Sequence, residues 1–345
     1  MSHLLFVPAT AAREAGADVG RQTTLTLARI DERLRADRSS LADAVAITVY
    51  LRRASDFPAM NDAYRQAWKS APPTRTTVIV DPRTPGADVE ISAVAVPAGA
   101  ERRPIQPSAW MASPNPYSYC IRSGDTLFLS GLLARNGRDN TAVPGDIATQ
   151  TRAVMENAKE LLEAAGLSFP HVVSARIFLP DLKDFAEMNS VYREYVGPDR
   201  PARATVGANL TAPAYKVEIT FVASAAERQA VDADPQKQPN LSPAIRAGNT
   251  LFVSGLLADG EAATGDPAAQ TRDIMRKLDG LLSKGGFART DVRDLLVYAT
   301  DDEAATIAAG ECRTSFGGKV AITTVKAALA APGARVEIMT QAERG

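Results

Sequence analysis

Two arginine–glutamate pairs with the same spacing are the residues of this chain best suited to act on a small molecule. Arg203 precedes Glu218 by fifteen residues, and Arg75 precedes Glu90 by the same fifteen. A guanidinium is a planar fork that binds a carboxylate through two hydrogen bonds. A glutamate within reach of the same ligand can position water or take a proton from it. The pairs therefore predict sites for small molecules that carry a carboxylate.

The scarcity of histidine and cysteine limits the other kinds of chemistry. His3 and His171 are the two histidines, and Cys120 and Cys312 are the two cysteines. These residues lack the spacing of a zinc site, and His171, at the entry to an apolar strand, is expected to be structural. No Gly-x-Gly-x-x-Gly follows a strand either. We therefore expect no metal and no cofactor, so catalysis must use Arg, Glu, Asn, Tyr, Ser and backbone amides.

Composition and charge are those of an ordinary globular protein, with 45% apolar and 23% charged residues in 345. The 39 basic and 40 acidic side chains give a net charge of −1, which argues against a nucleic-acid partner. No apolar run is long enough to span a bilayer. The N-terminus lacks the basic region of a signal peptide. We expect a cytoplasmic protein with no membrane partner.

The elements that must position the arginines and glutamates form a unit that covers residues 116–223. In order, the unit reads "PYSYCIRSGDTLFLSGLLA", "PGDIATQTRAVMENAKELLEAAGL", "VVSARIFLPDLKDFAEMNSVYREYV" and "RPARATVGANL…KVEI". Its apolar periodicity predicts a strand, a helix, a strand, a second helix and two closing strands. At roughly 110 residues, this α/β unit has the usual size of a domain.

The unit occurs three times along the chain. Residues 1–97 form a first copy that begins at the second strand of the unit, and residues 241–345 form a third copy. Two segments without periodicity, 98–115 and 224–240, are expected to be linkers over the surface.

The outer copies have lost complementary parts of the pattern. The first copy has Pro8-Ala9 where the second has Ser130-Gly131 and has no equivalent of Tyr117. The third copy keeps its Ser-Gly pair, but Ile322 stands at the place of the arginine. The late half of the pattern is therefore intact in the first copy, and the early half in the third.

The order and spacing of these motifs resemble the Rid family (YjgF type, reactive intermediate deaminases) along the whole unit. The resemblance implies a mixed sheet covered by two helices in each unit. Members of the family form homotrimers with a site in each interface between subunits. Three joined units therefore imply a single-chain pseudo-trimer that replaces the homotrimer. Whether such chains associate further stays open.

The resemblance also implies hydrolysis of enamines and imines derived from amino acids, to ketones and ammonia. In the second copy, Arg203 is expected to grip the substrate carboxylate. Glu218, expected near Arg203 across adjacent strands, would position or activate water. Ser130 and the Gly131 amide are expected to polarise or orient the substrate. The residues expected to close the pocket are Tyr117 and Asn189.

Corresponding residues are present in the other copies. The first copy supplies Arg75, Asn61 and Glu90. The third copy supplies Ser254, Gly255 and Glu337. If a site takes its halves from two neighbouring units, the intact halves can still meet, and we expect one or two working sites in the chain rather than three.

Two other functions stay open at the level of sequence. The first is a pathway-specific hydrolase or isomerase, since chorismatases resemble a single-chain pseudo-trimer of similar length. They lack a clear "PARAT" motif, however, and the intact Arg203 argues against that identity. The second is a small-molecule-binding protein that grips carboxylates without turnover.

Overall fold

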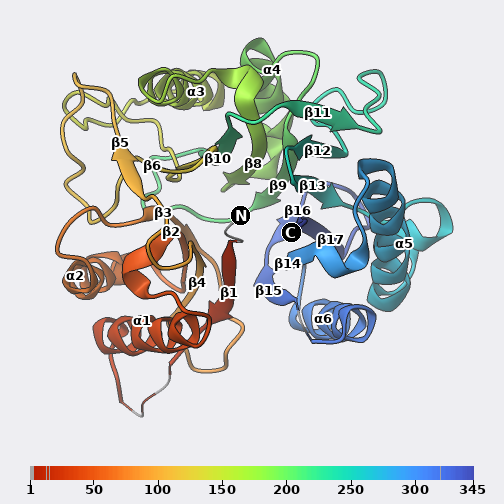
Figure 1. Cartoon of the computed structure of the whole chain (residues 1–345), viewed down its shortest axis with the longest axis horizontal. Coiled ribbons are helices and arrows are strands. Elements are labelled where there is room, and N and C mark those ends of the chain that lie inside the picture. Colours follow the sequence, from red (N-terminus) through yellow and green to blue (C-terminus); the bar gives the residue numbers. More distant parts are fainter. Residues whose placement is uncertain (1–3, 13, 15, 319) are drawn as a thin grey trace.

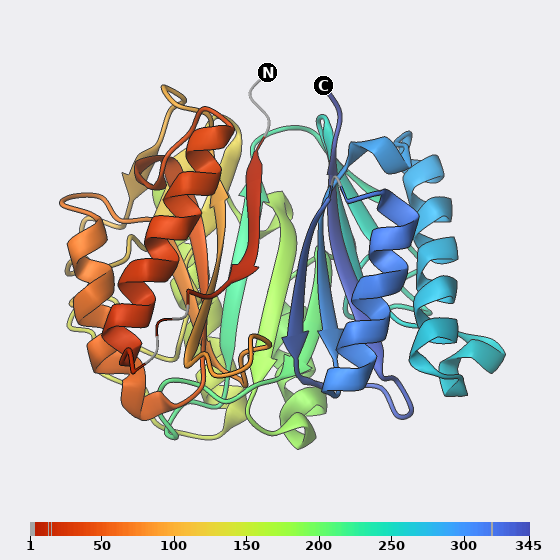
Figure 2. The ribbon, with the colours of Figure 1, turned by 90° about the horizontal axis from the view of Figure 1, so that it is seen from below.

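Three sheets stand around a central axis, and a pair of helices covers the outer face of each sheet (Figure 1). The computed structural model describes residues 4–12, 14, 16–318 and 320–345. Seen from the side, the strands run roughly along the axis and the helices lie outside them (Figure 2). The three α/β units expected from the repeats are present, arranged as a pseudo-trimer within one chain.

The second unit follows the predicted order with one correction. The apolar stretch before Ser130, predicted as one strand, forms a two-stranded hairpin, because the chain turns at Gly124 with a φ of 55°. The elements of the unit are β6 (Cys120–Ser123), β7 (Thr126–Leu129), α3 (Ile147–Ala164), β8 (Val172–Leu179), α4 (Phe185–Tyr195), β9 (Ala202–Gly207) and β10 (Glu218–Ser224).

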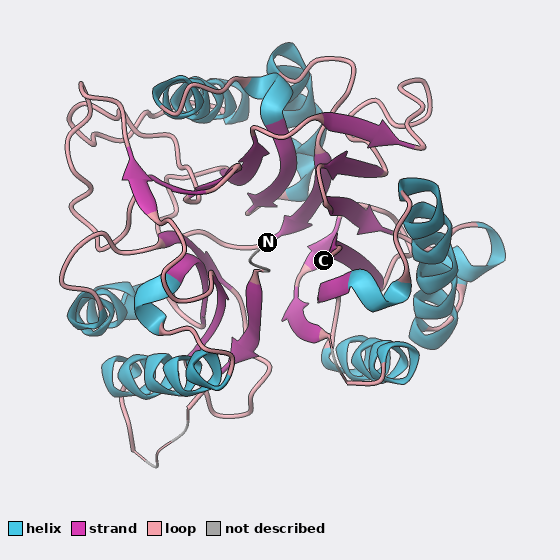
Figure 3. Ribbon diagram, in the orientation of Figure 1, coloured by secondary structure: helices cyan, strands magenta, loops and turns pink. Residues whose placement is uncertain are grey.

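Strand β8 lies inside this sheet and pairs in parallel with β9 on one side and antiparallel with β10 on the other. The hairpin β6–β7 extends the sheet beyond β10. The inner face of the sheet is directed toward the central axis, and its outer face packs on α3 and α4 (Figure 3).

The first and third units repeat this arrangement. The first unit lacks the strand equivalent to β6, as its sequence predicts, and consists of β1 (Leu5–Thr10), α1 (Val19–Ala36), β2 (Ala44–Leu51), α2 (Phe57–Ala67), β3 (Thr74–Ile79) and β4 (Val89–Ala95). The third unit consists of β12 (Ala244–Ala247), β13 (Thr250–Leu256), α5 (Pro267–Gly285), β14 (Val292–Ala299), α6 (Asp302–Phe316), β15 (Ala321–Lys326) and β17 (Val336–Glu343). The short β16 (Ala328–Leu329) between β15 and β17 pairs antiparallel with β9 and so joins the sheet of the second unit.

The segments expected to be linkers take part in the sheets. Strand β5 (Arg103–Ile105) pairs antiparallel with β6, and β11 (Arg228–Val231) pairs antiparallel with β12. Trp110 is also buried in the first of these segments, and its indole N–H donates to the Glu160 carboxylate at 2.7 Å. Each linker therefore adds an edge strand to the unit that follows it.

The glutamine of each Gln-Thr motif ties the first long helix of its unit to the strand that carries the glutamate. The Gln150 side chain accepts from the Lys216 N–H at 2.9 Å and donates to the Ala214 carbonyl at 2.8 Å. Gln270 accepts from the Arg335 N–H at 2.8 Å in the same way. In both units the bonded residue lies two positions before the glutamate, so the glutamine fixes the entry of that strand.

Replacing Gln150 tests this structural role. We expect Gln150→Met to lower the free energy of unfolding by about 1–3 kcal/mol, because it leaves the Lys216 N–H and the Ala214 carbonyl without partners. Arg152→Ala on the exposed face of α3 is the control, and removal of its surface pair with Glu194 should cost much less, because solvent screens an exposed ion pair. Urea-induced unfolding of both variants measures the difference, and equal losses would contradict the role.

Candidate active site

The arginine strands lie at two of the interfaces between units. At the first interface, between the first and second units, the Arg75 N–H on β3 donates to Ser130 Oγ at 2.9 Å. The Gly131 N–H returns a bond to the Arg75 carbonyl at 3.0 Å. At the second interface, between the second and third units, the Arg203 N–H on β9 donates to Ser254 Oγ at 2.8 Å. The halves of the pattern therefore meet across neighbouring units.

The serine and glycine have a structural role at these interfaces. Ser130 donates its own proton to the Ser118 carbonyl at 2.8 Å, and Ser254 donates to the Ser242 carbonyl at 2.6 Å. The Gly131 amide is also occupied, by Arg75. These donors hold the strand that carries the arginine, and a part for Ser130 and the Gly131 amide in polarising or orienting the substrate stays a prediction.

At the first interface, the Arg75 guanidinium lies in an aromatic box supplied by both units. Its Cζ atom lies 4.9 Å from the ring centre of Tyr64, and 5.5 Å from those of Phe57 and Tyr117. The side chain is buried, and its Nη1 has no hydrogen-bond partner. Cation–π contacts fix the orientation of the guanidinium plane. Because they do not use its N–H groups, those groups can still bind a ligand.

Asn61 and Tyr117 lie at this same interface. Asn61 is buried beside the arginine strand, where its amide donates to Asn115 Oδ1 at 3.2 Å and its own Oδ1 has no partner. The Tyr117 ring contacts Arg75 from the second unit. Burial raises the pKa of the Tyr117 phenol, so its hydroxyl stays a hydrogen-bond donor at neutral pH.

The acid of the first interface is Glu218, from the second unit. Burial raises its pKa to about 8, while the backbone N–H of Thr77 and the charge of Arg75 act in the opposite direction. The Thr77 N–H donates to Glu218 Oε1 at 3.4 Å. At pH 7 this carboxyl is therefore mostly protonated when no ligand is bound.

The second interface repeats the arrangement with different neighbours. Arg203 Nη1 donates to Asn189 Oδ1 at 2.7 Å, and its Cζ lies 4.9 Å from the ring centre of Tyr192. Burial raises the pKa of Glu337 to about 8, and the charge of Arg203 opposes that shift. Leu241 replaces the tyrosine that faces the arginine at the first interface, and it lines a hollow of about 480 Å³ beside Ser254 and Gly255.

The glycine of each Ser-Gly pair makes room for the acid. A Cβ atom at Gly131 would lie 1.9 Å from Glu218 Oε1, and one at Gly255 would lie 1.8 Å from Glu337 Oε1. Any other residue would force the carboxyl to move. This close approach explains why Ser-Gly occurs in the two units that supply an acid to an arginine.

The third interface, between the third and first units, lacks the arginine. Ile322 stands on β15 at the arginine position. Glu90 is buried, and its carboxylate accepts from the backbone N–H groups of Arg83 at 3.0 Å and Thr84 at 2.7 Å. Glu90 also lines a hollow with Ile322, so the third interface keeps the acid, held by backbone N–H groups of its own unit, but lacks the arginine.

The predicted partners within one copy are wrong. Arg203 on β9 and Glu218 on β10 are separated by β8, which pairs with both strands, so the two strands are not adjacent. Arg75 and Glu90 are separated by β2 in the same way. The arginine and the glutamate of one copy, fifteen residues apart, therefore lie on opposite sides of the strand between them. Each glutamate faces a neighbouring unit.

Sequence reasoning missed the aromatic residues that hold the guanidinium groups. Tyr64 and Tyr192 are fully buried and stack on Arg75 and Arg203. The signal was present, because each tyrosine lies three residues after the asparagine of a repeated Met-Asn motif. Nothing in a single copy reveals that its arginine is stacked on that tyrosine.

Among the described residues, His171, Cys120 and Cys312 take no part in these interfaces. His171 Nδ1 accepts from the Ser168 N–H at 3.1 Å, which is the structural role expected for it. Cys120 and Cys312 are buried and free. Among the described residues, no group of three or more His, Cys, Asp or Glu side chains is placed to hold a metal ion. Nor does any helix in that part of the chain combine the length and apolar character needed to cross a bilayer.

Relatives of known sequence each correspond to about a third of the chain. A RutC family protein of Pyrococcus horikoshii is 42% identical over 108 residues, which are 31% of this chain and 86% of that protein. A protein of Bos taurus named 2-iminobutanoate/2-iminopropanoate deaminase is 33% identical over 122 residues, 35% of this chain and 89% of its own.

Two solved structures also cover about a third of this chain and nearly all of their own. The YjgF gene product of E. coli is 30% identical and covers 36% of this chain and 98% of its own, with a TM-score of 0.33. A putative endoribonuclease of Thermotoga maritima is 30% identical and covers 37% of this chain and all of its own, with a TM-score of 0.35. The family described as endoribonuclease L-PSP matches residues 7–97, 108–225 and 232–344. With these three matched segments and three corresponding sheets, the chain belongs to this family, the YjgF or Rid family.

Proposed function

We propose that the chain hydrolyses small imines and enamines that carry a carboxylate, at the first and second interfaces. The observation that supports this function best is the meeting of a buried arginine with a buried acid from the next unit, twice in one chain. The deaminase relatives support the same reaction class. The substrate class follows from the two protein groups. The guanidinium matches a substrate carboxylate, and the protonated acid matches a substrate nitrogen that accepts a proton.

Binding begins at the arginine. The substrate carboxylate takes the N–H groups of Arg75 that lack a protein partner, and the aromatic box keeps the guanidinium plane fixed. The same part is played by Arg203 at the second interface. A buried fork of this kind fixes the orientation of a planar acid, so the C=N carbon is presented to the acid of the neighbouring unit.

The protonated acid then acts twice. Glu218 gives its proton to the imine nitrogen, which makes the C=N carbon more electrophilic. The resulting carboxylate takes a proton from the water that attacks this carbon, forming a carbinolamine. Glu218 then returns that proton to nitrogen, the C–N bond breaks to release ammonia, and the carbinolamine hydroxyl gives its proton to the Glu218 carboxylate as the ketone forms. One water is consumed, Glu218 is regenerated, and Glu337 follows the same sequence.

Arginine substitutions test how many interfaces work. We expect Arg75→Ala and Arg203→Ala each to remove one site and to leave the turnover of the other. The double variant should lose at least about 100-fold in kcat/KM, because hydrogen bonds to a charged partner contribute ~1.5–3 kcal/mol each. The measurement is steady-state ammonia release from freshly generated 2-iminobutanoate.

The control for these variants is Arg83→Ala at the third interface, where Arg83 bonds Thr306 at 3.0 Å and also Asp302. Its activity should stay unchanged. Carboxylate binding without turnover in the native chain would instead indicate a binding protein. No activity on any imino acid would indicate a specialised hydrolase or isomerase.

The raised pKa values of the two acids predict a pH dependence. The first step needs the protonated carboxyl, so kcat/KM should be level below about pH 7 and fall as the pH rises through about 8. The double variant Glu218→Gln/Glu337→Gln should give no rate of hydrolysis above the uncatalysed one at any pH. It should still bind a stable 2-oxo acid. Activity that rises through pH 8 would contradict an acid as the first proton donor.

Glycine substitutions test whether the position of the Glu218 and Glu337 carboxyl groups matters for activity. We expect Gly131→Ala/Gly255→Ala to lower kcat/KM by at least about tenfold, because each new Cβ displaces a carboxyl from its place beside the arginine. Gly310→Ala on α6 is the matched control, since a Cβ there has no neighbour within 4 Å. Thermal unfolding monitors stability, and unchanged activity in the double variant would remove Glu218 and Glu337 from the mechanism.

A further inference from the structure

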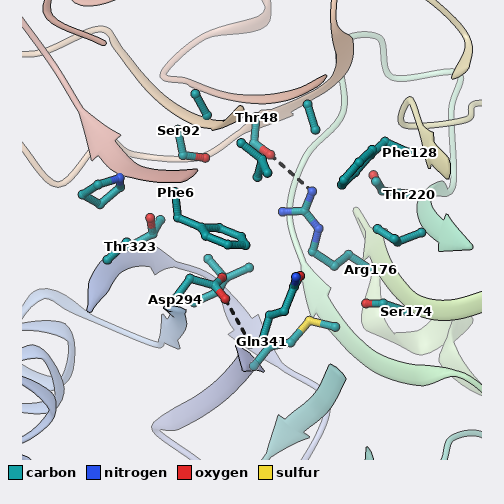
Figure 4. A pocket seen from close by; sticks show the side chains of 18 of the residues that line it. Phe6, Thr48, Ser92, Phe128, Ser174, Arg176, Thr220, Asp294, Thr323 and Gln341 are labelled. Carbon is teal, nitrogen blue, oxygen red and sulfur yellow. Dashed lines mark hydrogen bonds between the residues drawn. The ribbon is translucent and has the colours of Figure 1, made fainter. Parts of the chain in front are cut away.

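A cavity of about 140 Å³ lies at the centre of the molecule, where the inner faces of the three sheets meet (Figure 4). It is separate from the arginine pairs of the first and second interfaces, none of which line it. Its walls are largely apolar, and each unit contributes to them. The apolar side chains that line it include Phe6, Phe128, Leu296, Phe252 and Met339.

An arginine and an aspartate from different units enter this largely apolar space. Arg176 on β8 donates to Thr48 Oγ1 at a long 3.3 Å, and Asp294 on β14 accepts from the Gln341 N–H at 3.0 Å (Figure 4). No ion pair joins the two groups in the part of the chain that the structure describes, although the charge of Arg176 acts on Asp294. The Gln341 side-chain amide nitrogen, also at the cavity, has no partner.

The placement of these charges breaks the pseudo-threefold symmetry. By strand pairing, the position of Arg176 holds Thr48 in the first unit and Leu296 in the third. The position of Asp294 holds Ala46 and Ser174 in the other two units. Identical units would bring three like charges to the axis, which repel one another at short range. The fused chain places one positive and one acidic group there.

We infer that the central cavity binds one small zwitterion, an α-amino acid with a short apolar side chain. Its carboxylate would bond the guanidinium of Arg176 and the free amide of Gln341, and its ammonium group would bond Asp294. The side chain would lie against the phenylalanine rings. An apolar cavity of about 150 Å³ accommodates a molecule of the size of benzene, so the volume suits an amino acid such as valine.

Three probes of the same shape separate the recognition elements. L-Valine carries both charged groups, 3-methylbutanoate lacks the ammonium, and 2-methylpropylamine lacks the carboxylate. We expect one L-valine to bind per chain, and each of the two analogues to bind at least about tenfold more weakly, since each leaves a charged group of the cavity without a partner. Calorimetric titration of the full chain measures stoichiometry and affinity.

The titration is carried out in Arg75→Met/Arg203→Met, so that the first and second interfaces cannot take the carboxylate. Valine binding should persist in that background and be lost when Arg176→Met/Asp294→Leu is added. Removing both charges together avoids leaving one of them buried alone, and thermal unfolding confirms that this variant folds. The inference is overturned by a Kd for valine weaker than about 10 mM, or by binding that survives Arg176→Met/Asp294→Leu.

Discussion

The two candidate sites depend on one contact between units, in which a serine hydroxyl accepts a hydrogen bond from the backbone N–H of an arginine in the preceding unit. Because the serine gives its own proton to a carbonyl of its own unit, the hydroxyl fixes the arginine strand relative to the neighbouring sheet. The acid enters beside that same point, where a glycine leaves room for it. Burial of the arginine and the acid, and hence the raised pKa of the acid, follows from this docking.

Much of the architecture could be predicted from the chain alone. The repeats, the order of the long strands and helices, the shortened start of the first unit and the loss of arginine in the third can all be recognised in the sequence. The hairpin before Ser130 and the edge strands inside the linkers were not, because short strands gain their stability from partners that a local pattern does not contain.

The site was predicted as a set of residue types but not as a set of partners. Spacing along the chain pairs Arg203 with Glu218, whereas the sheet places β8 between them and turns each toward a different unit. Only the arrangement of the units decides which acid faces which arginine. The same holds for Ser130, whose role depends on the atom that its proton reaches.

The three units close into a ring, and the third interface, called the seam below, is the one that no linker spans. Linkers span the first and second interfaces, whereas the third is closed by contacts between β1 and β15 and by the Leu4 N–H bond to Glu343 Oε2 at 3.1 Å. The seam is thus the interface without the arginine. Tethering keeps the other two pairs of units at an effective concentration on the order of millimolar. Dilution, which would take apart sites shared between separate chains, leaves these two assembled, because the linkers keep each arginine near the acid of the next unit.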